Sequence, residues 1–273
     1  MAFPIENKLV IAIASSALFD LTESDAIFKS QGEDKYRQYQ NKNINRPFAP
    51  GVAFPFIKRM LSLNTAFSDI KPVEVILMSR NSPETGLRAF RSIEHYNLEI
   101  SRASFTSGNS NYQYLPGFNA SLFLSANQKD VTEALNAGYA AGRVVNDEVI
   151  EDDESDNELR IAFDFDGVLA DDASEKVYKS DGLESYLTHE HDHANEPLSL
   201  GPIGELLRKI SYYQKREKLM RKNDSSYSRI IKTYIVTARN APAHERVITS
   251  LKDWGVEVDE AFFLGGIDKS RIL

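Results

Sequence analysis

The feature that most limits what this chain can fold into is a repeat of its own sequence at a distance of 150 residues. The segment IAIASSALFDLT at 11–22 has a near-twin in IAFDFDGVLADD at 161–172. In the same way, AIFKSQGEDKY at 26–36 matches KVYKSDGLESY at 176–186. Because similarity at one fixed spacing indicates duplicated structural units, we expect two homologous domains rather than a short-period solenoid.

The repeat continues after a short change in length. The segment VILMSRNSP at 75–83 matches YIVTARNAP at 234–242, which places Thr237 opposite Met78. Further on, HYNLEISRASFTSG matches DWGVEVDEAFFLGG, so that the glycine-containing ends of both segments coincide. The two copies therefore extend over most of the chain.

Each copy has the same order of predicted elements. Apolar strands are expected at 9–14 and 73–78 in the first copy, and at 159–163 and 232–237 in the second. A polar helical segment and an amphipathic helix separate the strands of each pair. Strands that alternate with helices predict an α/β fold with parallel, doubly wound (Rossmann-like) sheets, which bind ligands at the carboxyl ends of their strands.

The domain boundaries follow from the acidic run NDEVIEDDESDNE. We expect a first unit at 1–145, an acidic linker at 146–158 and a second unit at 159–273. The first unit continues with a further strand and helix at 120–144, whereas the second ends soon after the equivalent point. The second unit is therefore expected to lack its last strand.

Composition excludes several classes of function. The chain of 273 residues has no cysteine, which excludes thiolate nucleophiles, disulfides and cysteine-ligated metal sites. A net charge of -8 argues against a partner that is a nucleic-acid polymer. The apolar run KLVIAIASSALF resembles a secretory signal, but its flanking charges cancel and it has a twin inside the chain. No apolar run approaches the roughly 20 residues of a membrane span, so we expect a cytoplasmic protein without a membrane partner.

Two carboxylates stand where the first strand of the second copy ends. Asp164 and Asp166 directly follow the apolar segment LRIAF, and side chains two residues apart at a strand end point the same way. Such a pair can bind a hard cation such as Mg²⁺ through oxygen ligands, or divide the roles of nucleophile and proton donor. The alternative is a structural role as a helix N-cap or a loop acid.

The segment DFDGVLADD resembles the first motif of the haloacid-dehalogenase-like (HAD-like) phosphohydrolases. In that family the first aspartate becomes an aspartyl-phosphate and the second is the general acid/base. The second family motif is a Ser or Thr at the end of the following strand, which Thr237 matches in YIVTARN. The third is a lysine, which Lys269 matches in GGIDKS.

Longer stretches resemble the type I cytosolic 5′-nucleotidases and their bacterial relatives, over nearly the whole chain. They include SSALFDLTES, HEHDHANEPLSLGP and LKDWGVEVDEAFFLGGIDK. The resemblance implies two tandem HAD-like units with a helical cap inserted in the second, and Mg²⁺-dependent hydrolysis of nucleoside 5′-monophosphates such as AMP or IMP. It assigns Asp164 as nucleophile and metal ligand, Asp166 as acid/base and metal ligand, Thr237 as a hydrogen-bond donor to the phosphate and Lys269 as its charge partner.

Four further residues are candidates for substrate binding. His193 lies in the segment THEHDHANEPL, which the resemblance places as a cap with His193 near the nucleotide; a zinc site on its three histidines is the alternative. Ala238, Arg239 and Asn240 follow Thr237 where we expect a helix to begin, and backbone N–H groups at a helix N-terminus bind phosphate. A structural role for the Arg-Asn pair is the alternative, since the first copy repeats it.

The resemblance is incomplete in one respect. The family's fourth motif, an acidic pair that completes the magnesium site, would fall after Leu273, and its counterpart FLSAN in the first unit has no acid. Mg²⁺ would then rest on Asp164, the backbone carbonyl of Asp166, water and substrate phosphate, and we expect it to bind weakly.

The first copy lacks the acids. Asp164, Asp166, Thr237 and Lys269 correspond in the alignment to Ala14, Ser16, Met78 and Asn111. We expect the first unit to be a scaffold that supplies part of the substrate pocket or the interface of a homo-oligomer. Two other functions stay open: a phosphatase for another small phosphate ester, and a nucleotide-binding or regulatory protein with weak catalysis.

Overall fold

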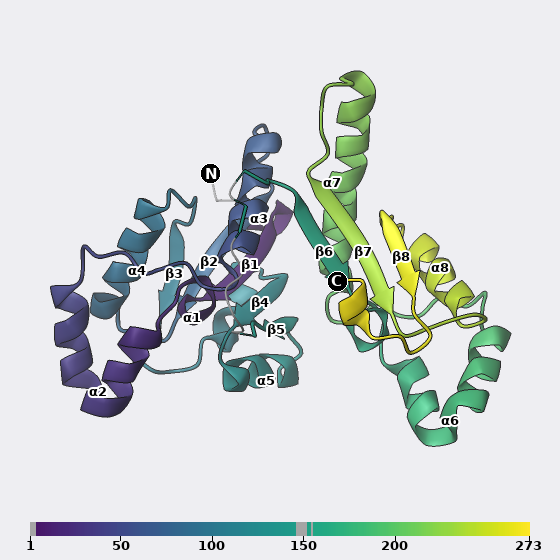
Figure 1. The fold of residues 1–273 in the computed structure, drawn as a ribbon, viewed down its shortest axis with the longest axis horizontal. Coiled ribbons are helices and arrows are strands. Elements are labelled where there is room, and N and C mark those ends of the chain that lie inside the picture. Colours follow the sequence, from purple (N-terminus) through teal and green to yellow (C-terminus); the bar gives the residue numbers. More distant parts are fainter. Residues whose placement is uncertain (1–3, 146–151, 154) are drawn as a thin grey trace. The chain divides into compact units, whose positions relative to one another are not determined.

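The computed structural model describes residues 4–145, 152–153 and 155–273, and the chain divides into two compact units at Asp156 (Figure 1). Both units are built from parallel strands and helices, which confirms the predicted α/β class. Residues 146–151 and 154 of the expected linker lie outside the described residues. In the described ranges, no helix combines the length and the apolar character that crossing a membrane requires.

The first unit contains a five-stranded parallel sheet with the strand order β3-β2-β1-β4-β5. Its strands are β1 (Leu9–Ala14), β2 (Val73–Ser79), β3 (Arg102–Phe105), β4 (Leu122–Ser125) and β5 (Ala141–Arg143). All residues of β1 and β2 are buried, as expected for the apolar central strands of a covered parallel sheet. The short strand β5 was not predicted from the sequence.

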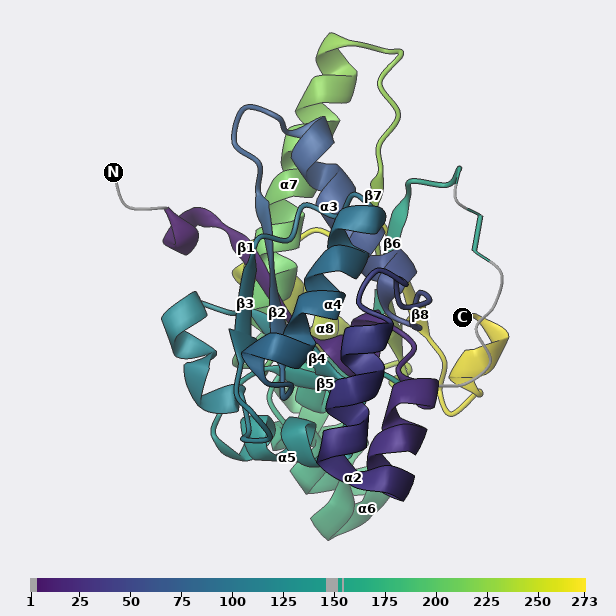
Figure 2. The same cartoon turned by 90° about the vertical axis from the view of Figure 1, so that its left-hand side faces the viewer.

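The helices of the first unit begin with a single turn directly after β1. They are α1 (Ser15–Leu18), α2 (Thr22–Lys42), α3 (Phe54–Ala66), α4 (Pro83–His95) and α5 (Gln128–Asn136), with 3₁₀ turns at Ile5–Asn7, Tyr112–Tyr114 and Pro116–Phe118. α2 is the predicted polar helical segment, and it lies beside α4 (Figures 1 and 2). Ser82 and Asn127 cap the N-termini of α4 and α5 through their side chains.

The second unit repeats this order on a smaller sheet with the strand order β6-β7-β8. Its elements are β6 (Leu159–Phe163), a loop turn at Phe165–Leu169, α6 (Ala173–Asp192), α7 (Gly204–Asn223), β7 (Ile231–Thr237), α8 (His244–Asp253), β8 (Glu260–Phe263) and a 3₁₀ turn at Lys269–Arg271. Whereas β1 pairs with a strand on each side, the described residues give β6 only β7 as a neighbour.

The strand register corrects the alignment of the two copies by one residue. Ser79 pairs with Phe105 in the first sheet, and Thr237 pairs with Phe263 in the second. The prediction that Thr237 stands opposite Met78 is therefore wrong: its counterpart is Ser79. The repeated dipeptide Arg-Asn puts the sequence alignment out of register, because one further residue, Ala238, stands between the strand end and the dipeptide in the second copy.

With the corrected register, Arg80 of the first copy and Arg239 of the second are no longer counterparts. Backbone N–H groups two residues after each hydroxyl donate to it, from Asn81 to Ser79 and from Arg239 to Thr237, at 3.2 Å in both units. The counterpart of Arg239 is thus Asn81, and Arg80 has a different place. The first unit does not repeat the side chain that Arg239 brings to the second.

The loop after the first strand differs in length between the units. In the first unit, the N–H of Phe19 donates to the carbonyl of Ser15 and closes the turn of α1. In the second, the N–H of Ala170 donates to the carbonyl of Phe165, which encloses one residue more. The extra residue is accommodated by Gly167, whose φ of +69° lies in the left-handed region. The loop that carries the two aspartates is therefore one residue longer than its counterpart.

Candidate functional site

Asp164 stands at the end of β6, and Lys269 lies opposite it. One carboxylate oxygen accepts a hydrogen bond from the N–H of Phe165 at 2.8 Å, and the other lies 2.5 Å from Nζ of Lys269. The two side chains are 44% and 33% exposed. The structure thus brings two of the predicted catalytic residues into an ion pair that is open to a ligand from solvent.

Asp166 has a different partner. Arg239 donates to both of its oxygens, from Nε at 2.9 Å and from Nη2 at 2.6 Å. Burial alone would lower the pKa of Arg239, but the hydrogen bonds and negative charge of Asp166 raise it above its ordinary value. This two-point contact fixes the plane of the Asp166 carboxylate.

The far side of Arg239 binds Glu190, a fully buried residue of α6. Glu190 also accepts from Nη1 of Arg246, a residue of α8, at 2.9 Å. Burial by itself raises the pKa of Glu190, but the positive charges of Arg239 and Arg246 and its hydrogen bonds bring the pKa below its ordinary value. Sequence reasoning missed Glu190 and Arg246 as site residues.

Thr237 ends β7 and is fully buried. Its Oγ1 accepts the N–H of Arg239, so its own hydroxyl proton stays available for a further acceptor. Ala238 and Asn240 are exposed, and Asn240 packs beside Gly265. The helix expected to begin at these residues begins later, at His244, so the N–H groups of 238–240 do not lie at a helix N-terminus.

His193 stands directly after the last residue of α6. Its Nδ1 lies 2.8 Å from the carbonyl oxygen of His189, and the two imidazole rings stack with centroids 4.2 Å apart. These contacts fix His193 at the end of α6 with its side chain 38% exposed.

The acidic residues at the site offer few ligands for a metal ion. Within the described ranges, no three His, Asp or Glu side chains converge closely enough to hold an ion. The carboxylate of Asp164 is accessible, whereas that of Asp166 faces Arg239 and leaves its backbone carbonyl as the donor. These are the oxygen donors that Mg²⁺ prefers, and Mg²⁺ commonly takes its remaining ligands from water and substrate phosphate. The site therefore fits Mg²⁺ in kind, with a small number of protein ligands.

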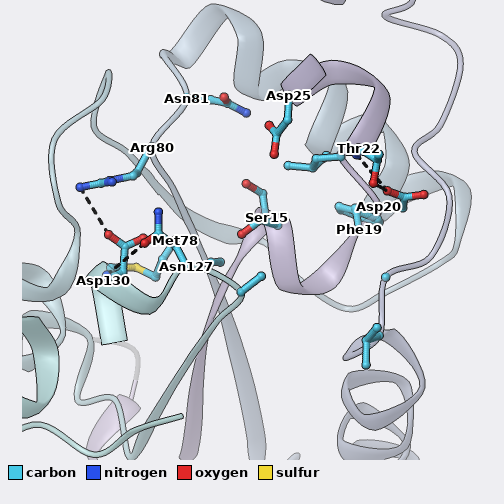
Figure 3. A pocket seen from close by; sticks show the side chains of 16 residues that line it. Ser15, Phe19, Asp20, Thr22, Asp25, Met78, Arg80, Asn81, Asn127 and Asp130 are labelled. Atoms are coloured by element: carbon cyan, nitrogen blue, oxygen red, sulfur yellow. Dashed lines mark hydrogen bonds and ion pairs between the residues drawn. The ribbon is translucent and has the colours of Figure 1, made fainter. Parts of the chain in front are cut away.

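The first unit has a pocket at the same edge of its sheet. A cavity of about 580 Å³ lies at the carboxyl ends of β1 and β2 (Figure 3). Arg80 pairs there with Asp130 at 3.3 Å, and Ser15, Asp25 and Asn81 also line the pocket. Since Ala14 stands at the place of Asp164, the ion pair of the second unit has no equivalent in this pocket.

These sites and the fold define an α/β protein whose second unit carries a paired carboxylate and lysine at the carboxyl edge of a parallel sheet. A family model for 5′-nucleotidase matches residues 1–273, and the chain belongs to that family. It is similar to human cytosolic 5′-nucleotidase 1B, with 35% identity over 274 residues that cover 98% of this chain. The chain spans 44% of the length of that relative. No solved structure matches the chain.

Proposed function

We propose that this chain hydrolyses nucleoside 5′-monophosphates to a nucleoside and inorganic phosphate. The observation that carries the proposal is the accessible ion pair between Asp164 and Lys269, in a chain of the 5′-nucleotidase family. A carboxylate that is exposed at a strand end can reach phosphorus, and an ammonium group beside it can offset the charge of a phosphoryl group.

In this proposal Asp164 is the nucleophile. One of its oxygens attacks phosphorus, the bond from phosphorus to the ribose O5′ breaks, and an aspartyl-phosphate forms. Asp166 donates a proton to the departing O5′ and later accepts one from the water that hydrolyses the aspartyl-phosphate. The contact with Arg239 supports this role because it orients the Asp166 carboxylate.

Thr237 and Lys269 bind the phosphoryl group. The hydroxyl proton of Thr237 is free to donate, because its oxygen already accepts from the backbone. Lys269 lies close enough to Asp164 to stay beside the phosphoryl group after transfer. Mg²⁺, held by Asp164 and the carbonyl of Asp166, would supply further positive charge to the phosphate.

The remaining substrate contacts are assigned to residues whose side chains are exposed near the ends of β7 and α6. Ala238 and Asn240 are exposed beyond the end of β7, and His193 is partly exposed at the end of α6. Arg239, which was also a candidate for substrate binding, differs from these residues because its guanidinium already binds Asp166 and Glu190. The base and ribose of AMP or IMP would be recognised by the exposed residues, where remote binding sets specificity.

We also propose that the two units are tandem HAD-like domains, a degenerate one at 1–145 and a catalytic one at 159–273. The repeated strand order and register support this assignment. α6 would form the helical cap of the second unit, and the first unit would be a scaffold.

Phosphate release from a panel of nucleoside monophosphates, with and without Mg²⁺, tests the proposal. We expect Mg²⁺-dependent release by the wild-type chain and loss of release in Asp164→Asn. Release from other phosphate esters but from no nucleotide would show a different phosphatase. AMP or IMP binding without release would instead show a nucleotide-binding protein.

A further inference from the structure

We propose that Glu190 and Arg246 are positioning residues that act through Arg239 to hold the carboxylate of Asp166 in the orientation needed for proton transfer. The inference rests on the proposed function, in which Asp166 is the acid/base. Neither residue is proposed to touch the substrate phosphate. Both affect the reaction through the guanidinium group of Arg239.

The contacts form a continuous chain that joins four separate segments of the second unit. Arg246 of α8 binds Glu190 of α6, Glu190 binds Nη1 of Arg239 after β7, and the opposite edge of Arg239 binds Asp166. The side chains of Glu190 and Arg239 are 0% and 1% exposed. Water therefore does not replace these contacts, and the loss of one leaves a buried charge without its partner.

The geometry of Arg239 explains how Glu190 acts at a distance. Its Nη1 donates to Glu190 and to the carbonyl of Ala243, at 3.2 Å for the latter. Because a guanidinium is planar and rigid, fixing Nη1 also fixes the edge formed by Nε and Nη2. That edge is the one that donates to Asp166.

The first unit contains the counterpart of the contact between Arg246 and Glu190, with a neutral amide in place of the carboxylate. Gln40 and Arg88 occupy the places of Glu190 and Arg246, and Arg88 Nη1 donates to Gln40 Oε1 at 3.1 Å. The two arginines also share their second partner, a backbone carbonyl: that of Arg46 at 2.8 Å and its counterpart in the second unit at 2.9 Å. The fold thus needs a hydrogen bond at this place and no carboxylate.

The negative charge at the position of Glu190 is present only in the unit that also has Arg239 and Asp166. In the first unit Asn81 stands at the place of Arg239, and Ala14 and Ser16 stand where the second unit has Asp164 and Asp166. A neutral Gln40 is then sufficient. We infer that the negative charge of Glu190 serves Arg239, and through it Asp166, rather than the packing of α6 on α8.

The test is Glu190→Gln, which installs the side chain that the first unit uses beside Arg88. We expect the variant to fold, kcat for the best nucleotide of the panel to fall about 10- to 100-fold, and KM to change by less than about threefold. Glu190→Asp keeps the charge and should recover part of the lost kcat. The matched control is Gln40→Glu in the first unit, which should leave kcat unchanged.

The outcomes separate this inference from the proposed function. A wild-type chain that releases no phosphate from any nucleotide overturns the proposed function itself. An active wild type together with a folded Glu190→Gln of unchanged kcat overturns the inference alone, as does a change confined to KM. If Glu190→Gln does not fold, Arg246→Lys decides: an unchanged kcat overturns the inference, and a several-fold lower kcat at unchanged KM supports it.

Discussion

Ser79 and Thr237 hold the same place in the two units, and each hydroxyl accepts the backbone N–H two residues further on at 3.2 Å. Because the first unit has the same hydrogen bond without counterparts of Asp164 and Asp166, this bond belongs to the architecture of the strand end. In the second unit the same hydroxyl is also proposed to donate to phosphate.

The two roles of Thr237 can be separated with two variants. Thr237→Ser, which copies the first unit, should retain both stability and most of the activity. Thr237→Val leaves the buried N–H of Arg239 without an acceptor, so we expect it to lower the free energy of unfolding by about 1–3 kcal/mol and to reduce kcat. Urea unfolding and phosphate release measure the two effects, and equal activity of both variants would contradict the role in phosphate binding.

Lys269→Met removes the ammonium group beside Asp164. We expect kcat to fall about 100- to 1,000-fold, because the developing phosphoryl charge loses the ammonium group that offsets it. Stability should change little, since both members of the ion pair are partly exposed. Lys252→Met on α8 is the control for loss of one positive charge, and a kcat for Lys269→Met that matches this control would rule out the proposed role.

Gly167→Ala tests the loop that carries the aspartates. The φ of +69° disfavours alanine by about 1–2 kcal/mol, whereas the added Cβ meets only Glu175 Oε2, at the ordinary distance of 3.6 Å. Gly255→Ala is the matched control, because Gly255 has φ +65° with nothing within 4 Å of the new Cβ. We expect a similar loss of stability in both variants, and a lower kcat only in Gly167→Ala. Equal kcat values would show that the loop conformation does not matter for turnover.

The stability of the chain should depend on pH through Glu190. Its pKa in the folded chain lies below the ordinary 4.5, so the unfolded chain takes up the proton first as the pH falls. The stabilisation is therefore fully present above the ordinary pKa and is lost as the pH falls through the lower, folded-state value. The difference in free energy of unfolding between wild type and Glu190→Gln should shrink over this range.

Urea unfolding between about pH 3 and pH 6 measures this difference. Glu257→Gln is a suitable control because the pKa of Glu257 is also lowered, by its hydrogen bond to Lys218, but the pair is half exposed and contributes little. A difference between wild type and Glu190→Gln that stays constant with pH would show that the charge of Glu190 does not stabilise the fold.

Hydrophobic pattern and repetition were sufficient to predict most strands of the fold. β1 occupies the predicted 9–14, and β7 begins one residue before the predicted 232. The three-residue β5 was missed, because AGR carries no apolar alternation. The register error at Thr237 arose because the identical Arg-Asn letters were aligned, although Ala238 stands between Thr237 and that dipeptide in the second copy.

The family resemblance assigned Asp164 and Lys269 to one site, where the structure places them in an ion pair, whereas the network around Asp166 was not predicted. Arg239 and Glu190 are 49 residues apart, and no local pattern says that their side chains meet inside the protein. A signal was nevertheless present: Gln40 and Arg88 recur as Glu190 and Arg246, with a change of charge at only one member of the pair. Comparison of the two copies position by position would have singled out Glu190.

The extra residue in the loop after β6 has a consequence for how the two units diverged. Aspartates introduced at positions 14 and 16 would restore the letters of the motif on a turn that closes one residue earlier, between Ser15 and Phe19. The second carboxylate would then project from a different backbone path, with Asn81 at the place of Arg239. The first unit therefore differs from the second in loop length as well as in side-chain chemistry, and replacing single residues would not reproduce the loop that carries Asp164 and Asp166.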